Sequence, residues 1–166
     1  MTHPLPKSAQ SVQNALEQKG VLDAHVMQLD ASTRTAVEAS QALQCQVGQI
    51  VKSLIFKTST THEPVLVLAS GPTRVNEKVI AHHVGQPIEK ADADFVRQVT
   101  GFAIGGVPPL GHMQTIPHIF IDVDLLSYEA VWAAAGTPNT VFRMESTALQ
   151  SITEGTLINV ENLPSC

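Results

Sequence analysis

A lysine inside an otherwise apolar segment is the first residue of this sequence that could do chemistry. Lys52 lies in QIVKSLIFKT, residues 49–58, whose β-branched and aromatic residues indicate a strand. Successive strand residues point to opposite faces, so Lys52 shares a face with Ile50, Leu54 and Phe56. Burying an unpaired ammonium costs several kcal/mol. Lys52 therefore either extends its amine to the sheet edge or lies in a cleft, where it meets an anion or a carbonyl oxygen.

The second candidate is the apolar segment TGFAIGGVPPLGHM, residues 100–113. Its glycines and prolines are Gly101, Gly105, Gly106, Pro108, Pro109 and Gly111. Glycines let the backbone approach a ligand closely, and prolines fix φ. Such a backbone could hold an anion, an ammonium or a water. The spacing matches neither a dinucleotide fingerprint nor a phosphate-binding loop, so the segment is either a structural turn or one wall of a binding site.

Histidine and cysteine side chains offer further candidates. His112 could act as a general base or as a donor to substrate, or it could be structural. Cys45 has no obvious histidine partner in the sequence, so a thiol nucleophile is not favoured. The other histidines show no metal-ligand spacing, and the two cysteines, Cys45 and Cys166, cannot form a zinc site alone. We therefore expect neither a metal nor another cofactor.

Length and charge restrict the class of protein. The chain has 166 residues, which suits one domain spanning residues 1–166. Ten Lys and Arg against fifteen Asp and Glu give a formal net charge of -5. This balance argues against a broad basic surface for nucleic acid but leaves room for a small basic cleft. The N-terminal residues show no secretory signal, and no apolar run approaches the roughly 20 residues of a membrane span. We expect a cytoplasmic protein with no membrane partner.

The elements that must position these residues alternate between strands and helices. Strands 49–58 and 64–70 are expected to form a hairpin. Ser8, Thr35 and Asp92 are expected to cap helices, the second with Glu38 at capping-box spacing. The remaining patterns predict helices at 8–19, 36–45, 74–85, 92–101, 127–136 and 146–155, and strands at 24–30, 118–124, 139–145 and 156–161. The expected fold class is α/β (α+β), with a mixed, mostly antiparallel, barrel-like sheet surrounded by helices.

Several ordered segments together resemble the YbaK/EbsC family. They run from about residue 20 to 160 and are VGQIVKSLIFKT, PVLVLASGPTRVNEKV, TGFAIGGVPPLGH, IFIDVDLLSYEAVWAAAG and TVFRMESTALQSIT. The family includes free-standing aminoacyl-tRNA deacylases and the editing domain of bacterial prolyl-tRNA synthetases. The resemblance implies hydrolysis of the ester that joins a wrong, small amino acid to the tRNA 3′ adenosine, on tRNA-Pro or a related tRNA. It also implies two candidate partners: the aminoacyl-tRNA acceptor end and an aminoacyl-tRNA synthetase.

The resemblance also implies roles for particular residues. Lys52 matches the family's strand lysine, and Gly105, Gly106, Val107, Pro108 and Pro109 match its Gly-x-x-x-Pro loop. Catalytic roles are expected for Lys52, Gly105 and Gly106. Substrate contacts are expected for Ser53, Val107, Pro108, Pro109, Gly111 and His112. Ser53 stands where some alanine-specific relatives have Asn, and Ala148 stands where some members carry Asp.

Two positive side chains, Arg74 and Lys78, are candidates for binding the tRNA end, although they could equally be ordinary solvated charges. Two other functions stay open. One is a non-catalytic nucleic-acid-binding regulator, which would require a basic face or a recognition helix. The other is a hydrolase of small aminoacyl esters, which would act without tRNA.

Overall fold

A central hairpin organises the fold. The computed structural model describes residues 5–30 and 35–163, and the hairpin joins β2 (Ile50–Thr58) to β3 (Pro64–Ser70). Their antiparallel register pairs Val51 with Ser70 and Lys57 with Pro64. The expected hairpin is confirmed, and β3 is buried from Val65 to Ser70, which makes it a central strand.

The sheet is mixed, and the described part of the chain contributes eight strands to it. Their order is β1-β7-β6-β2-β3-β5-β8, and β4 pairs with the far end of β2. The other strands are β1 (Met27–Gln28), β4 (Ile88–Lys90), β5 (His118–Asp122), β6 (Ala130–Ala134), β7 (Thr140–Glu145) and β8 (Thr156–Ile158). The β2–β6, β3–β5 and β5–β8 pairs are parallel, and the other four are antiparallel. The expected α/β class with a mixed, mostly antiparallel sheet is confirmed.

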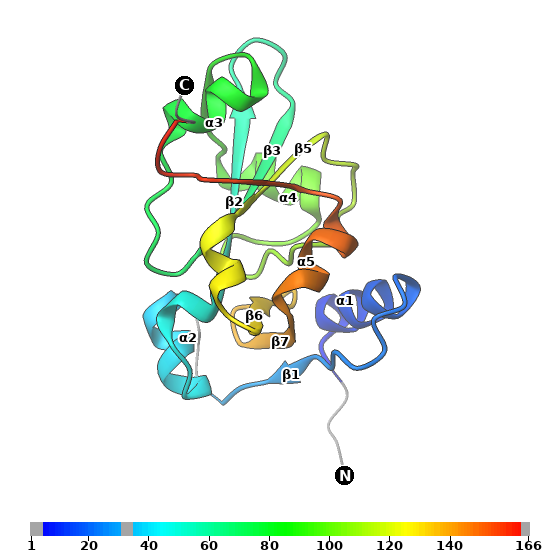
Figure 1. Ribbon diagram of the computed structural model, residues 1–166. Helices are drawn as coiled ribbons and strands as arrows, with labels where there is room; N and C mark the ends of the chain where they lie inside the picture. The colour runs from blue at the N-terminus through cyan, green and yellow to red at the C-terminus, as the bar shows by residue number, and fades with distance from the viewer. Residues whose placement is uncertain (1–4, 31–34, 164–166) are drawn as a thin grey trace.

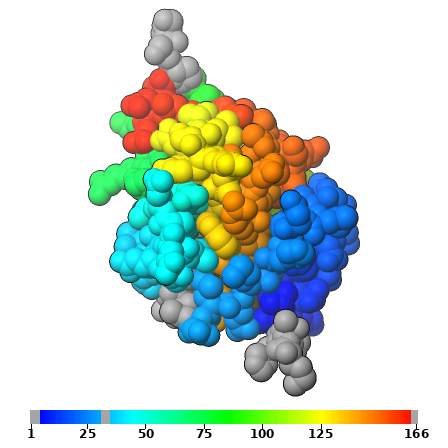
Figure 2. Space-filling view, turned by 60° about the horizontal axis from the view of Figure 1, so that its bottom comes forward, coloured from blue at the N-terminus to red at the C-terminus, as the bar shows by residue number. Residues whose placement is uncertain are grey.

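In the described residues, five α-helices surround this sheet. They are α1 (Lys7–Gln18), α2 (Ala36–Leu43), α3 (Glu77–Val84), α4 (Ala93–Thr100) and α5 (Ser146–Thr153), with short 3-10 turns η1 (Val47–Gln49) and η2 (Val123–Ser127). In Figure 1, α1 and α2 lie near β1 at one end of the molecule, and α3 lies at the other. Figure 2 views the first end, where the cyan chain of α2 and the blue chain of α1 flank yellow and orange segments.

Two buried apolar clusters hold these elements together. The larger contains Val12 and Leu16 of α1 with Leu66, Leu68 and Phe142 of the sheet. The smaller contains Val65 and Val67 of β3, Phe56 of β2, Ile80 of α3 and Phe120 of β5. Because side chains alternate along β3, Leu66 and Leu68 enter the first cluster, and Val65 and Val67 enter the second. Both faces of the hairpin are therefore covered.

Several expected elements differ in the structure. Residues 127–136 were expected to form a helix, but they contain strand β6, which pairs with both β2 and β7; these pairings override the helix propensity of its alanines. The N-cap of α1 is Pro6, not Ser8. The strand expected at 24–30 is limited to Met27–Gln28. The strand expected at 118–124 ends at Asp122, which caps the turn η2.

Other local expectations are confirmed. Thr35 Oγ1 accepts a hydrogen bond from the N–H of Glu38 at 3.1 Å, as an N-cap should. Asp92 Oδ1 accepts one from the N–H of Phe95 at 2.8 Å. Helix α4 then ends at Gly101, whose φ of 83° suits glycine.

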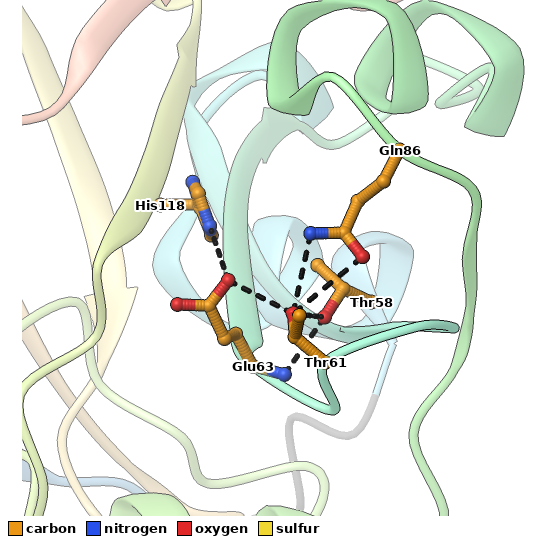
Figure 3. A network of polar contacts seen from close by, with 5 residues as sticks. All are labelled: Thr58, Thr61, Glu63, Gln86 and His118. Carbon is orange, nitrogen blue, oxygen red and sulfur yellow. Dashed lines mark hydrogen bonds and ion pairs between the residues drawn. The ribbon is translucent and has the colours of Figure 1, made fainter.

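A polar network fixes the turn of the hairpin, far along β2 from Lys52. Thr58 and Thr61 hydroxyls lie 2.8 Å apart, and the Thr61 hydroxyl donates to Glu63 at 3.0 Å. His118 of β5 and Gln86 join this cluster from opposite sides (Figure 3). The network links the hairpin turn to its neighbours.

Candidate functional site

Strand β2 has one edge that its neighbours cover only in part. On that edge, β6 pairs with Ile50 and Val51, and β4 pairs with residues 56–58. The carbonyl of Ile55 accepts the N–H of Ala91 at 3.4 Å, so backbone polar groups of odd-numbered residues point to this edge. Since the direction alternates along a strand, the backbone N–H and C=O of Ser53 face the uncovered gap.

A pocket of about 440 Å³ opens at this gap, and we call it the main pocket. Strand β2 supplies its floor, and helix α2 and strands β6 and β7 supply walls. Residues 100–113, which we call the glycine-rich loop, close another side. Its lining residues are Thr35, Ala36, Val37, Ala39, Leu43, Ile50, Val51, Lys52, Ser53, Leu54, Gly71, Ile104, Gly105, Val107, Trp132, Ala133, Ala134 and Val141. The structure thus brings Lys52, Ser53, Gly105 and Val107 together.

Lys52 supplies the positive charge of this pocket. Its Nζ donates a hydrogen bond to the carbonyl of Thr73 at 2.7 Å, which holds the ammonium at the end of β3 rather than in bulk solvent. Burial lowers the pKa of Lys52 from its ordinary value, and the carboxylate of Asp122 opposes that shift. Among the described residues that line the main pocket, Lys52 is the one with a charged side chain.

Asp122 is a buried carboxylate whose role the sequence patterns did not reveal. The residue is only 2% exposed. One oxygen accepts the N–H of Ser70 and the other the N–H of Asp124, both at 3.0 Å. The sequence signal that could have identified Asp122 is the same as for Lys52: a charged residue within an apolar strand.

The Ser53 hydroxyl is a buried polar group without a hydrogen-bond partner among the described residues. A buried hydroxyl without a partner is destabilising, and such groups in native proteins call for an explanation. Together with the backbone groups of Ser53, this hydroxyl leaves hydrogen-bonding capacity at the pocket floor.

The glycine-rich loop presents backbone to the pocket. Gly105 is exposed with φ of 96°, which favours glycine. Gly106 lies so close to the 136–137 backbone that an added Cβ would be 2.9 Å from Thr137, and its carbonyl accepts the N–H of Gly136 at 2.9 Å. Within the described chain, no acceptor is found for the N–H of Gly105 or of Val107. These amides remain available to a ligand.

The rest of the loop turns away from the main pocket. Gly106, Pro108, Pro109, Gly111 and His112 are not among its lining residues. His112 Nε2 lies 2.7 Å from the carbonyl of Pro108, and an added Cβ on Gly111 would meet Ala15 of α1 at 3.2 Å. Burial lowers the pKa of His112, and the Pro108 hydrogen bond opposes the shift. This end of the loop packs toward α1.

Arg74 and Lys78 are both exposed and follow Thr73, the acceptor of the Lys52 ammonium. They flank the start of α3, where the Asn76 side chain accepts the N–H of Lys78 at 3.0 Å. Neither side chain forms an ion pair with another described residue. Both charges are free to meet an anion outside the pocket.

Sequence patterns missed most of the pocket's walls. Helix α2, Ile104, Gly71 and Trp132 line the main pocket, but nothing in their spacing places them near Lys52. In the described part of the chain, no group of three His, Cys, Asp or Glu side chains could hold a metal ion. Nor does that part contain a helix long and apolar enough to cross a membrane.

Comparisons with known proteins show the family to which the chain is similar. Residues 30–152 match the family model described as the aminoacyl-tRNA editing domain. A solved structure provisionally described as a trans-editing enzyme for prolyl tRNA synthetase is 43% identical, with a TM-score of 0.90, and the match covers 96% of this chain and 99% of that one.

Two curated relatives extend the comparison. YwhH of Bacillus subtilis (strain 168), whose function is uncharacterised, is 26% identical over 119 residues, which are 72% of this chain and 74% of YwhH. The proline--tRNA ligase of Brachyspira hyodysenteriae (strain ATCC 49526 / WA1) is 36% identical over 78 residues, which are 46% of this chain and only 13% of the ligase. The YbaK-type resemblance and the expected enzyme class, an aminoacyl-tRNA deacylase, are confirmed. The chain belongs to the aminoacyl-tRNA editing domain family.

Proposed function

We propose that this protein removes a small, wrongly attached amino acid from tRNA-Pro or a related tRNA by hydrolysing the ester bond. The observation that carries the proposal is the main pocket, which joins the Lys52 ammonium to the free N–H groups of Gly105 and Val107. The solved relative described for prolyl tRNA synthetase supports the choice of tRNA.

The reaction needs no protein nucleophile. An aminoacyl ester is already activated, and a water adds to its carbonyl carbon while the neighbouring ribose hydroxyl assists. The bond from carbonyl carbon to ribose oxygen then breaks, and the ribose oxygen takes up a proton. The protein's task is to hold the ester and to stabilise the negative charge on the carbonyl oxygen. Lys52 and the amides of Gly105 and Val107 are the groups of this pocket suited to that task.

Pocket size would set the amino-acid preference. Ala36, Ala39, Ala133 and Ala134 contribute small side chains to the walls, and Val107 contributes a larger one. One methylene separates substrates by only about 1–3 kcal/mol in a binding site, so a synthetase cannot fully exclude a smaller amino acid. A second site that admits only small side chains removes the resulting errors.

The partner is the acceptor end of the aminoacyl-tRNA, and an aminoacyl-tRNA synthetase would be the source of the mischarged substrate. Arg74 and Lys78 would contact phosphates next to the terminal nucleoside. An overall charge of -5 is compatible with this arrangement, because only the end of the tRNA has to touch the protein.

The test compares deacylation of tRNA-Pro charged with Ala, Ser, Thr, Cys or Pro. We expect release of at least one small amino acid well above the uncatalysed rate, with Pro released more slowly. Equal activity on small aminoacyl esters without tRNA would instead indicate the small-ester hydrolase. No deacylation at all, combined with sequence-specific DNA binding, would indicate the regulator.

A further inference from the structure

A second pocket lies directly beside the main pocket, and we call it the side pocket. Its volume is about 420 Å³. It is lined by Ser53, Leu54, Ile55, Phe56, Val75, Glu77, Lys90, Ala91, Val96, Ile104 and Val107. Ser53, Leu54, Ile104 and Val107 line both pockets. The two hollows are therefore halves of one site, divided by the middle of β2 and the tip of the glycine-rich loop.

The two halves differ in charge. The main pocket has Lys52 as its charged side chain, whereas the side pocket has the carboxylate of Glu77 and the ammonium of Lys90. No described residue forms a hydrogen bond or ion pair with either of these two side chains. Their hydrogen-bonding capacity is free for a ligand.

The remaining walls of the side pocket are apolar. Leu54, Phe56, Val75 and Val96 come from β2, the segment before α3, and α4. Ile104 at the loop tip is 60% exposed, which leaves a large apolar side chain uncovered at the entrance to both pockets. Nucleobases are held by such surfaces against their flat faces, with polar groups at their edges.

The geometry points to the side pocket as the site for the adenine base of the terminal nucleoside, with the aminoacyl group in the main pocket. This inference rests on the proposed function. The ester lies between the base and the amino acid in the substrate, just as Ser53 and Val107 lie between the two pockets. The Glu77 carboxylate accepts a hydrogen bond from the exocyclic amine of adenine, which is a donor that purine itself lacks.

The experiment uses mischarged tRNA whose terminal nucleoside is either adenosine or purine riboside, which lacks the 6-amino group. A hydrogen bond to a charged group changes binding by about 10- to 100-fold. We expect kcat/KM of the wild-type protein to fall by this factor on the purine riboside substrate. We expect Glu77→Ala to lose activity on the adenosine substrate and to treat the two substrates alike, and Glu77→Gln to recover part of the difference.

Glu77 is also an acidic residue in the first turn of α3, so its removal affects the helix itself. Asp94→Ala is the matched control, because Asp94 is a first-turn acid of α4 that lines neither pocket. It should keep the full preference for adenosine. Equal kcat/KM on both substrates in the wild-type protein, or an undiminished preference in Glu77→Ala, would overturn the assignment.

A binding measurement separates this inference from the proposed function. We expect titration with adenosine 5′-monophosphate to shift the NMR signals of Val75, Glu77 and Ala91. Titration with purine riboside monophosphate should shift the same signals more weakly. If these shifts appear without deacylation, the proposed function fails and the adenine site stands. If deacylation occurs but no shift arises around the side pocket, the adenine site fails alone.

Discussion

Gly106→Ala tests whether close packing of the glycine-rich loop holds the pocket wall in place. An added Cβ would lie 2.9 Å from both the Cα and the N of Thr137 and 3.0 Å from the carbonyl carbon of Gly136. These are backbone atoms and cannot rotate away, so the loop must move. The move also weakens the 2.9 Å hydrogen bond from the Gly136 N–H to the Gly106 carbonyl.

The size of the effect follows from these contacts. Overpacking a filled site costs about 1–3 kcal/mol, and a lost hydrogen bond adds about 0.5–1.5 kcal/mol. For a chain of this length, each kcal/mol corresponds to a Tm change of about 2–4 °C, so a decrease of roughly 3–18 °C is expected. A displacement of about 1 Å at a reacting group can cost about 100-fold in rate, and we expect a comparable loss of deacylation.

Calorimetry and a deacylation assay measure the two effects separately. Gly155→Ala is the matched control, since its Cβ would be 2.9 Å from the side chain of Ile119 and Gly155 lines neither pocket. It should lower Tm while leaving kcat/KM close to that of the wild-type protein. An unchanged Tm and an unchanged rate in Gly106→Ala would refute the proposed role of this contact.

Three further changes probe the surroundings of the site. Ser53→Ala removes a buried hydroxyl that has no partner, so the free energy of unfolding should stay the same or rise while deacylation slows; a less stable but fully active variant would contradict this. Asp122→Asn places an amide between the N–H groups of Ser70 and Asp124, which should lower the free energy of unfolding by about 1–3 kcal/mol. It also removes a charge that raises the pKa of Lys52, so the alkaline limb of the pH–rate profile should move to lower pH. An unmoved limb would count against the coupling of Asp122 to Lys52. Burial holds the pKa of His112 in the folded state below its ordinary value of 6.5, so the unfolded chain binds the proton first as pH falls. The contribution of His112 to the free energy of unfolding should therefore be fully present above about pH 6.5 and be lost as pH falls below it. Urea titrations should show this pH dependence in the wild-type protein but not in His112→Gln.

Local signals in the sequence were sufficient for several elements. The caps at Thr35 and Asp92 and the end of α4 at Gly101 depend on residues within one helical turn. The hairpin of β2 and β3 depends on two apolar runs joined by a short turn. Such features are fixed by neighbours along the chain, so patterns identify them.

The strands that the sequence patterns did not predict form through pairing with strands far away in the sequence. Residues 130–134 have the alanine content of a helix, but β6 fills the place between β2 and β7, and no local pattern reveals those partners. The short strand β4 was not anticipated, because the sequence of Ile88–Lys90 has no strand pattern. Its strand conformation depends on pairing with the end of β2.

The candidate site was also only partly predictable from the sequence. The Lys52 signal came from a charge in an apolar strand, and the structure places that charge in the main pocket. The direction of the glycine-rich loop could not be predicted from its composition, because it depends on tertiary contacts: Gly111 lies against Ala15 of α1, and His112 Nε2 lies 2.7 Å from the carbonyl of Pro108. Roles for Pro108, Pro109, Gly111 and His112 in substrate binding therefore stay predictions, as do those of the other candidate residues.

The most direct test of the central claim is single-turnover deacylation of the preferred mischarged tRNA by Lys52→Ala and Lys57→Ala. Lys57 lies on the same strand but pairs with Glu89 at 3.3 Å and lines neither pocket. Because removing one group that stabilises an oxyanion costs about 100- to 1,000-fold, Lys52→Ala should lose at least about two orders of magnitude in rate while folding normally, and Lys57→Ala should remain active. Full activity in Lys52→Ala, or an equal loss in both variants, would contradict the account.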